Sequence, residues 1–301
     1  MSDVDSSPTV GPWAREKLDA LGAYLDFYMK VLKNQSHWCK GTIYVDAFAG
    51  QGRARVRRKD LSPAGALLAA LELPVDQDDE EFIRGSPRVA LDIPNPFSQY
   101  VFIERDPARA AQLEELRTEY PARRIDVHQG TAEQEIDALL QGDLGRPGFR
   151  AVVFLDPFGM QIPWATVERL AATKGIEVMI NFTLGMAIQR LLVRSGEINQ
   201  AWRAALDRFF GTSEWWDQAY EESADLFGPQ TRKLRDSGQR LLEWYRGRLE
   251  AAFGHVSPAR LIRNTRGGHL YYLIWAGPHP KGLVGANHIL SKGEKVTRST
   301  L

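Results

Sequence analysis

The residues best suited to chemistry form a small-residue loop, Asp46-Ala-Phe-Ala-Gly-Gln-Gly52, directly after the apolar run at residues 42–45. The apolar run predicts a buried strand. Glycines at the carboxyl end of such a strand let backbone N–H groups approach a ligand closely. The loop therefore predicts a cofactor site, and the alternative is that Gly50 and Gly52 only make a tight turn.

The residues after the loop argue against a dinucleotide. A dinucleotide loop continues to a third glycine that allows close helix–strand packing, but here the large Arg55 stands at that position. Asp46 instead suits a cofactor with an amino-acid ammonium group, which a buried carboxylate balances. S-adenosylmethionine has such a group and is the cofactor we predict. The loop residues predicted to contact it are Asp46, Phe48, Ala49, Gly50 and Gly52.

A second carboxylate, Glu104, ends the apolar run at residues 100–103. A carboxylate at the tip of a second strand can accept both hydroxyl hydrogens of a ribose, so Glu104 and its neighbour Arg105 are predicted cofactor contacts. The alternative is an ordinary polar strand end that caps the next helix. In dinucleotide folds such an acidic residue falls about 20 residues after the glycine loop. Glu104 comes much later, so an insertion must separate the two.

A third anchor is the turn Asp156-Pro157-Phe158-Gly159, which follows the apolar run at residues 151–155. Pro157 fixes its own φ and restricts Asp156 to an extended conformation, which holds the carboxylate in place. We predict that Asp156, Pro157 and Phe158 form the catalytic turn, with Asp156 also near the cofactor and Phe158 stacking on a substrate. A simple turn is the alternative, because Asp-Pro and Phe-Gly are common turn elements.

Residues 125–133 predict a further short strand and loop between the second and third anchors. An adenine ring could lie against this loop, where Thr131 and Ala132 are the predicted contacts. His128, in the same stretch, is expected to be a strand-end histidine rather than a catalyst.

The elements that must position these residues predict an α/β protein. We expect a Rossmann-like, mostly parallel sheet with an antiparallel late strand at residues 269–276, formed by residues 13–186 and 251–301. An amphipathic helix is expected at residues 17–32, and a tryptophan-rich helical lobe at residues 187–250. Residues 1–12 are expected to be a disordered tail.

The insertion is predicted at about residues 53–95. It holds an arginine-rich run at residues 53–59, which could contact a phosphate or an acidic substrate but is more simply a solvated loop. Two Ser-Pro pairs predict helices at residues 63–72 and 87–91.

The composition limits the possible partners. Thirty-eight basic residues offset 38 acidic ones, so binding to nucleic acid would have to depend on local patches. The single cysteine, Cys39, excludes an internal disulfide and a multi-cysteine metal cluster within the chain, and no metal site is predicted. A chain with a single cysteine suits a reducing compartment, so a cytoplasmic location is expected. No apolar run has the roughly 20 residues of a membrane helix.

Taken together, these motifs resemble the three-Cys-motif partner (TcmP) family, which is similar to class I S-adenosylmethionine-dependent methyltransferases. The resemblance covers most of the chain. The motifs that carry it are Tyr44-Val-Asp46-Ala-Phe-Ala-Gly50-Gln-Gly52, Gly85-Ser-Pro-Arg-Val-Ala-Leu91, Phe102-Ile-Glu104, Leu155-Asp156-Pro157-Phe158-Gly159 with Trp164, and Ile180-Asn181-Phe182.

The resemblance implies a Rossmann-like class I methyltransferase domain and a separate partner protein that carries a three-cysteine motif and resembles radical-adenosylmethionine enzymes. It does not supply a methyl acceptor; an amine and a nucleobase are the two candidates. This chain departs from the turn of amine-methylating enzymes in one respect. Those enzymes have two prolines before the aromatic residue, whereas here Phe158 directly follows the single Pro157. Two alternatives therefore stay open: a non-catalytic, cofactor-binding regulatory partner and, disfavoured by Arg55, a nicotinamide-dependent oxidoreductase.

Overall fold

The computed structural model describes residues 9–10, 13–57, 80–225, 228–264, 267–291 and 294–295. In these residues a nine-stranded sheet forms the centre of the molecule, with the strand order β14-β12-β13-β8-β7-β2-β5-β6 and β11 paired to β13. Its strands are β2 (Gly41–Asp46), β5 (Gln99–Glu104), β6 (Ile125–Gln129), β7 (Phe149–Leu155), β8 (Ile176–Phe182), β11 (His255–Val256), β12 (Arg260–Arg263), β13 (His269–Gly277) and β14 (Glu294–Lys295).

The strand directions define the fold. β6, β5, β2, β7 and β8 are parallel neighbours, whereas β13 runs antiparallel to both β8 and β12. Numbered along the chain without the two-residue strands β11 and β14, the order is 3-2-1-4-5-7-6. The predicted Rossmann-like sheet, mostly parallel with an antiparallel late strand, is confirmed by this topology.

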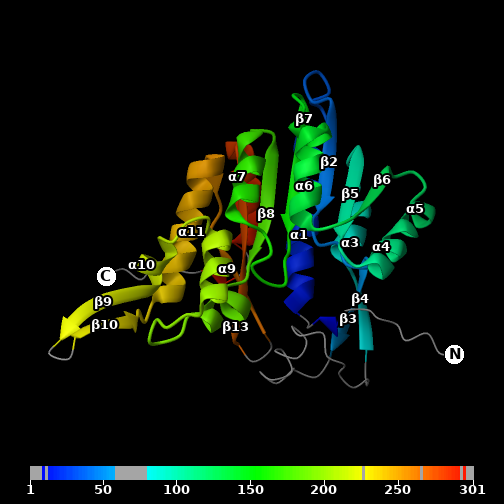
Figure 1. Cartoon of the computed structure of the whole chain (residues 1–301). Coiled ribbons are helices and arrows are strands. Elements are labelled where there is room, and N and C mark those ends of the chain that lie inside the picture. Colours follow the sequence, from blue (N-terminus) through cyan, green and yellow to red (C-terminus); the bar gives the residue numbers. More distant parts are fainter. Residues whose placement is uncertain are drawn as a thin grey trace.

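Helices cover both faces of the sheet (Figure 1). One buried cluster joins the sheet to α6, α7, α9 and α11, and a second joins the opposite face to α1, α3, α4 and α12. The helices are α1 (Trp13–Leu32), α3 (Ser86–Leu91), α4 (Pro107–Glu114), α5 (Leu116–Glu119), α6 (Ala132–Gln141), α7 (Trp164–Ala172), α8 (Gln189–Leu191), α9 (Gln200–Phe210), α10 (Trp215–Ala219), α11 (Ser237–Phe253) and α12 (Pro280–Leu290), with the short turns η1 (Asp143–Gly145) and η2 (Leu184–Ile188).

The alternation of side chains along β2 explains how the two clusters arise. Ile43 and Val45 point into the first cluster, whereas Tyr44 between them points into the second. Helix α1 meets this second face with Leu21 and Leu25, which are fully buried at helical spacing. Burial of each such side chain contributes about 1.5–3 kcal/mol, so packing holds α1 across the sheet.

The predicted insertion contributes a second, three-stranded sheet, in which β3 (Arg53–Arg57) lies between β1 (Thr9–Val10) and β4 (Glu80–Arg84). The start of the arginine-rich run is thus a strand and not a loop. The helix predicted at residues 87–91 is present as α3. The helix predicted at residues 63–72, and the expected tail apart from Thr9 and Val10, lie outside the described residues.

Residues 187–250 hold α8, α9, α10 and α11 and also a hairpin that the sequence did not predict. This hairpin, β9 (Tyr220–Asp225) with β10 (Gly228–Lys233), projects away from the body of the molecule (Figure 1). Trp215 is fully buried, and its indole N–H donates to Asp207 over 2.7 Å, whereas Trp202 is 41% exposed. Division of the chain at residues 186 and 250 stays a prediction. None of the described helices is long and apolar enough to span a membrane.

Candidate functional site

The predicted carboxylates lie at one edge of the sheet. Asp46 at the end of β2 pairs with Phe102 of β5 on one side and with Phe154 of β7 on the other. Glu104 comes two residues after Phe102, and Asp156 comes two residues after Phe154. The two carboxylates therefore lie on either side of Asp46, at the carboxyl ends of β5 and β7. β2 and β7 are also where the strand order reverses direction, which is the usual ligand position in open parallel sheets.

Asp46 is completely buried. Its Oδ1 accepts a hydrogen bond from the Phe48 N–H (3.3 Å), and its Oδ2 accepts one from the Tyr44 hydroxyl (3.3 Å). Burial raises the pKa of Asp46 to about 7; a hydrogen bond from Ser86 opposes this rise, and the negative charge of Asp156 adds to it. A cationic group brought beside Asp46 would therefore stabilise its ionised form.

The glycine loop has the backbone that glycine favours. Gly50 and Gly52 have φ values of 61° and 73°. The Ala49 N–H donates to the Ile103 carbonyl over 3.0 Å, which ties the loop to β5. A Cβ on Gly50 would meet no atom of the described residues within 4 Å, so these residues leave space beside this part of the loop. Phe48 and Ala49 contribute to the two core clusters instead.

Glu104 and Arg105 continue the edge beyond β5. Glu104 Oε1 accepts the Asp106 N–H over 2.8 Å, and Asp106 in turn caps α4 by accepting the Arg109 N–H over 2.9 Å. Among the described residues no donor reaches Glu104 Oε2. Arg105 is exposed. Glu104 can thus serve both as a polar strand end and as a ribose contact. Its Oε1 holds Asp106 at the start of α4, and its Oε2 is available to a ligand.

Thr131 and Ala132 lie close to Glu104, at the start of α6. The Gly130 N–H donates to the Glu104 carbonyl over 3.1 Å, which joins the ends of β5 and β6. Thr131 caps α6, since its hydroxyl accepts the Gln134 N–H over 3.4 Å. Thr131 is exposed and Ala132 is buried.

Asp156 is held from two sides. Its Oδ1 accepts a hydrogen bond from the Asn181 amide over 2.7 Å, and its Oδ2 forms an ion pair with Lys17. Pro157 is buried, whereas the Phe158 ring is 69% exposed. The turn therefore combines a fixed carboxylate with an aromatic ring open to solvent.

Lys17 is a site residue that the sequence reasoning missed. It comes from α1 and is 13% exposed beside Asp156. Burial lowers the pKa of Lys17, but the negative charges of Asp156 and Asp46 and the neighbouring Tyr271 more than compensate, and the pKa lies above its ordinary value. One signal could have identified Lys17, because it precedes the buried Leu21 by one helical turn and so lies on the apolar stripe of α1.

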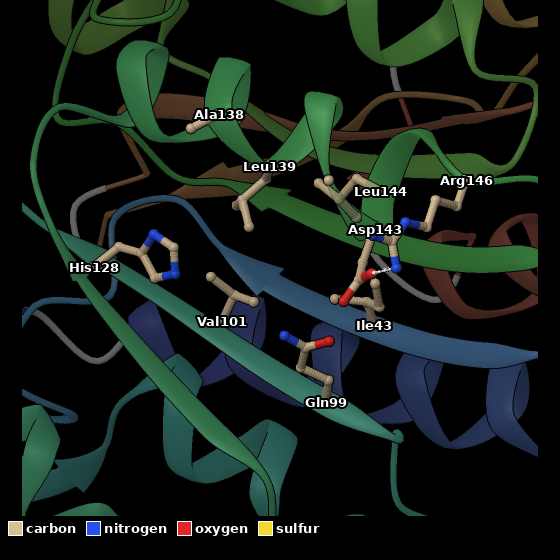
Figure 2. A pocket seen from close by; sticks show the side chains of 10 residues that line it. Ile43, Gln99, Val101, His128, Ala138, Leu139, Asp143, Leu144 and Arg146 are labelled. Atoms are coloured by element: carbon tan, nitrogen blue, oxygen red, sulfur yellow. Dashed lines mark ion pairs between the residues drawn. The ribbon is translucent and has the colours of Figure 1, made fainter.

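A cavity of about 370 Å³ lies elsewhere, between the sheet and the α6–η1 segment (Figure 2). Gln99 and Ile43 line it near the amino ends of β5 and β2, and Arg146 forms an ion pair with Asp143 at its rim (2.8 Å). His128, also on its wall, is 2.9 Å from Glu135. None of the predicted cofactor or catalytic residues lines this cavity.

No family model and no curated protein matches the chain. Solved structures resemble it weakly. A Legionella pneumophila protein, LPL1258, has a TM-score of 0.46 at 13% identity and covers 91% of each chain. Human methyltransferase-like protein 13 in complex with SAH has a TM-score of 0.38 at 14% identity (95% and 97% covered), and the N-terminal domain of EvdMO1 with SAH bound has 0.37 at 11% (85% and 81%). These scores are too low to bear on function, and the fold assignment depends on the strand order above.

Proposed function

We propose that this chain is an S-adenosylmethionine-dependent methyltransferase. The observation that carries the proposal is the set of three carboxylates, Asp46, Glu104 and Asp156, at the carboxyl ends of adjacent strands in a sheet of order 3-2-1-4-5-7-6. A general α/β sheet does not require a buried aspartate, a positive-φ glycine loop and a ribose-competent carboxylate at the same edge.

The residues present fit this cofactor. The buried Asp46 would balance the ammonium group of the cofactor, and Glu104 Oε2 would accept a hydrogen bond from a ribose hydroxyl. The glycine loop has space beside Gly50, where its backbone could contact the cofactor. S-adenosylmethionine supplies an electrophilic methyl group when bound. The protein's contribution is to orient the acceptor at the Asp156 turn and to exclude water, so that proximity and desolvation provide most of the rate enhancement.

The acceptor and any partner protein are finer proposals. Resemblance to the three-Cys-motif partner family motivates association with a radical-adenosylmethionine-like protein. The net charge of zero does not favour a nucleic-acid substrate. Co-purification of the chain with such a protein, with and without S-adenosylmethionine, tests the association directly.

Calorimetric titration with S-adenosylmethionine, S-adenosylhomocysteine and NAD tests the cofactor. We expect the first two to bind and NAD to bind weakly or not at all, and the opposite result would refute the proposal. Glu104→Ala should weaken S-adenosylmethionine binding by roughly 1.5–3 kcal/mol, the range for hydrogen bonds to a charged group. Glu115→Ala, which removes an exposed carboxylate at the end of α4, is the matched control and should leave affinity unchanged.

If the cofactor binds but no acceptor is methylated in the presence of the partner, the non-catalytic alternative gains support. Asp156→Ala then separates the roles, because it should leave cofactor affinity largely intact while transfer to an identified acceptor is lost.

A further inference from the structure

Three polar side chains beside the Asp156 turn have buried atoms without a hydrogen-bond partner in the described part of the chain: Asn181 (Oδ1), Thr183 (Oγ1) and Tyr271 (hydroxyl). Their residues are only 6%, 2% and 4% exposed. Native proteins satisfy the large majority of buried polar groups, so three exceptions next to one another call for a physical reason.

The strand register places these groups together. Asn181 pairs with Leu273 of β13, and Tyr271 lies two residues from Leu273 and hence on the same face of that strand. Thr183 follows two residues after Asn181, just beyond the end of β8. This is the face that α1 covers, and Lys17 Nζ lies 5.4 Å from the centre of the Tyr271 ring. Asn181 and Lys17 both bind Asp156, which connects the cluster to the proposed catalytic turn.

The cluster offers both hydrogen-bond donors and acceptors. Lys17 has N–H groups beyond the one it gives to Asp156, and the Thr183 and Tyr271 hydroxyls can donate or accept. Asn181 Oδ1 can only accept, and the Asp156 carboxylate has lone pairs beyond those engaged by Asn181 and Lys17. A ligand that satisfies this set must therefore present an acceptor atom and an N–H or O–H donor side by side.

The charges limit the ligand further. A phosphate or carboxylate would bring its oxygens against Asp156 and Asn181 Oδ1, whereas an alkylammonium would meet Lys17, which already occupies Asp156. We infer that Lys17, Asn181, Thr183 and Tyr271 form an acceptor-binding subsite for an uncharged amide-like group, such as a carboxamide or the amide-like edge of a heterocycle. The exposed Phe158 ring in the adjoining turn suits a flat ligand of this kind, because aromatic faces stack on planar groups.

This subsite is the acceptor side of the proposed methyltransferase and so rests on that function. The hydroxyls are covered, so the inference requires the Lys17 side chain, whose Nζ lies 5.4 Å from the centre of the Tyr271 ring, to move when a ligand enters. Lys17 and Asp156, with 13% and 19% of their side chains exposed, form the accessible part of the cluster.

Two isosteric variants, Tyr271→Phe and Thr183→Val, test the inference. Each removes a hydroxyl that has no partner in the described chain, so the urea midpoint should stay equal or rise, whereas a hydroxyl with a structural partner would lower it. Tyr28→Phe is the matched control, since Tyr28 also has a buried hydroxyl without a partner among the described residues but lies in the aromatic core formed with Tyr24 and Phe97.

Binding is read by saturation-transfer NMR on protein saturated with S-adenosylhomocysteine, with cytosine and nicotinamide as uncharged probes and methylamine and phosphate as charged ones. We expect the uncharged probes to bind wild type and Tyr28→Phe, and to bind Tyr271→Phe and Thr183→Val at least fivefold more weakly. The inference would be overturned if the charged probes bound more strongly than the uncharged ones, or if the uncharged probes did not bind. It would also be overturned if the uncharged probes bound equally to wild type and to the three variants.

Failure of the proposed function has a different signature, because S-adenosylhomocysteine itself would not bind in calorimetry. The probes are then titrated into the protein alone, where dependence of cytosine binding on Tyr271 and Thr183 still decides whether the subsite exists.

Discussion

The buried Asp46 makes cofactor affinity depend on pH, and the structure sets the size of this effect. The pKa of Asp46 is raised to about 7 by burial. The ammonium group of S-adenosylmethionine would bind the ionised form, so binding below this pKa must release a proton, and affinity must fall as the pH falls.

The magnitude follows from the ionised fraction. With a pKa of about 7, roughly 3% of Asp46 is ionised at pH 5.5 and about half at pH 7. Affinity should therefore rise roughly 16-fold over this interval, or ~1.6 kcal/mol. The interval also stays below the pH at which the α-amino group of the cofactor loses its charge, which is about 7.7–8.0.

Calorimetric titration at pH 5.5, 6, 6.5 and 7 measures this rise, and repetition in two buffers of different ionisation enthalpy counts the released protons. About 0.9 proton should be released at pH 6. Asp46→Asn should bind weakly with no such slope, whereas Glu104→Gln should bind weakly with the slope retained. A flat affinity profile in wild type, or a slope that survives in Asp46→Asn, would refute the reasoning.

Three further predictions concern stability. Glu177, buried at the start of β8 with Tyr24 and Trp275 as donors, has its pKa raised to about 7 by burial. The pKa of Glu177 is higher in the folded than in the unfolded state, so the free energy of unfolding decreases as the pH rises towards 7. Glu177→Gln should make this decrease between pH 5 and 8, measured by urea unfolding, smaller by roughly 2 kcal/mol. A decrease of the same size in the variant and in wild type would contradict the prediction. Lys17→Met should lower the unfolding free energy by roughly 1–3 kcal/mol because Asp156 loses its counter-ion, and Asp156→Asn in the same chain should recover part of this loss; additive effects in the double-mutant cycle would argue against the ion pair. Gly50→Ala should cost only about 1–2 kcal/mol, since its Cβ has space and only φ is strained, and a larger loss in thermal unfolding would indicate a hidden steric contact.

The parts of the site that could be predicted from sequence are those that depend on neighbours along the chain. Asp46, Glu104 and Asp156 each end an apolar run, and parallel strands bring such ends to one edge of a sheet. A mostly parallel sheet could be predicted from the same runs, because strands that alternate with helices are joined by right-handed crossovers into parallel neighbours.

The parts that could not be predicted depend on contacts between distant segments. Lys17 meets Asp156 across 139 positions of sequence, and its place on the apolar stripe of α1 did not identify that partner. The groups without partners, Thr183 and Tyr271, become neighbours only through the pairing of β8 with β13. The hairpin β9–β10 was missed because its strands, Tyr220–Asp225 and Gly228–Lys233, are polar and carry no apolar alternation.

The position of β13 has a consequence for the synthesis of the protein. β13 inserts between β8 and β12 although its residues, 269–277, leave the ribosome after those of both neighbouring strands. Until then β8 is an edge strand whose unpaired N–H and C=O groups can pair with another chain. The nascent protein thus exposes an unpaired edge at β8, the strand that bears Asn181. Pairing of β13 with β8 covers this edge and, in the same step, brings Tyr271 beside Asn181.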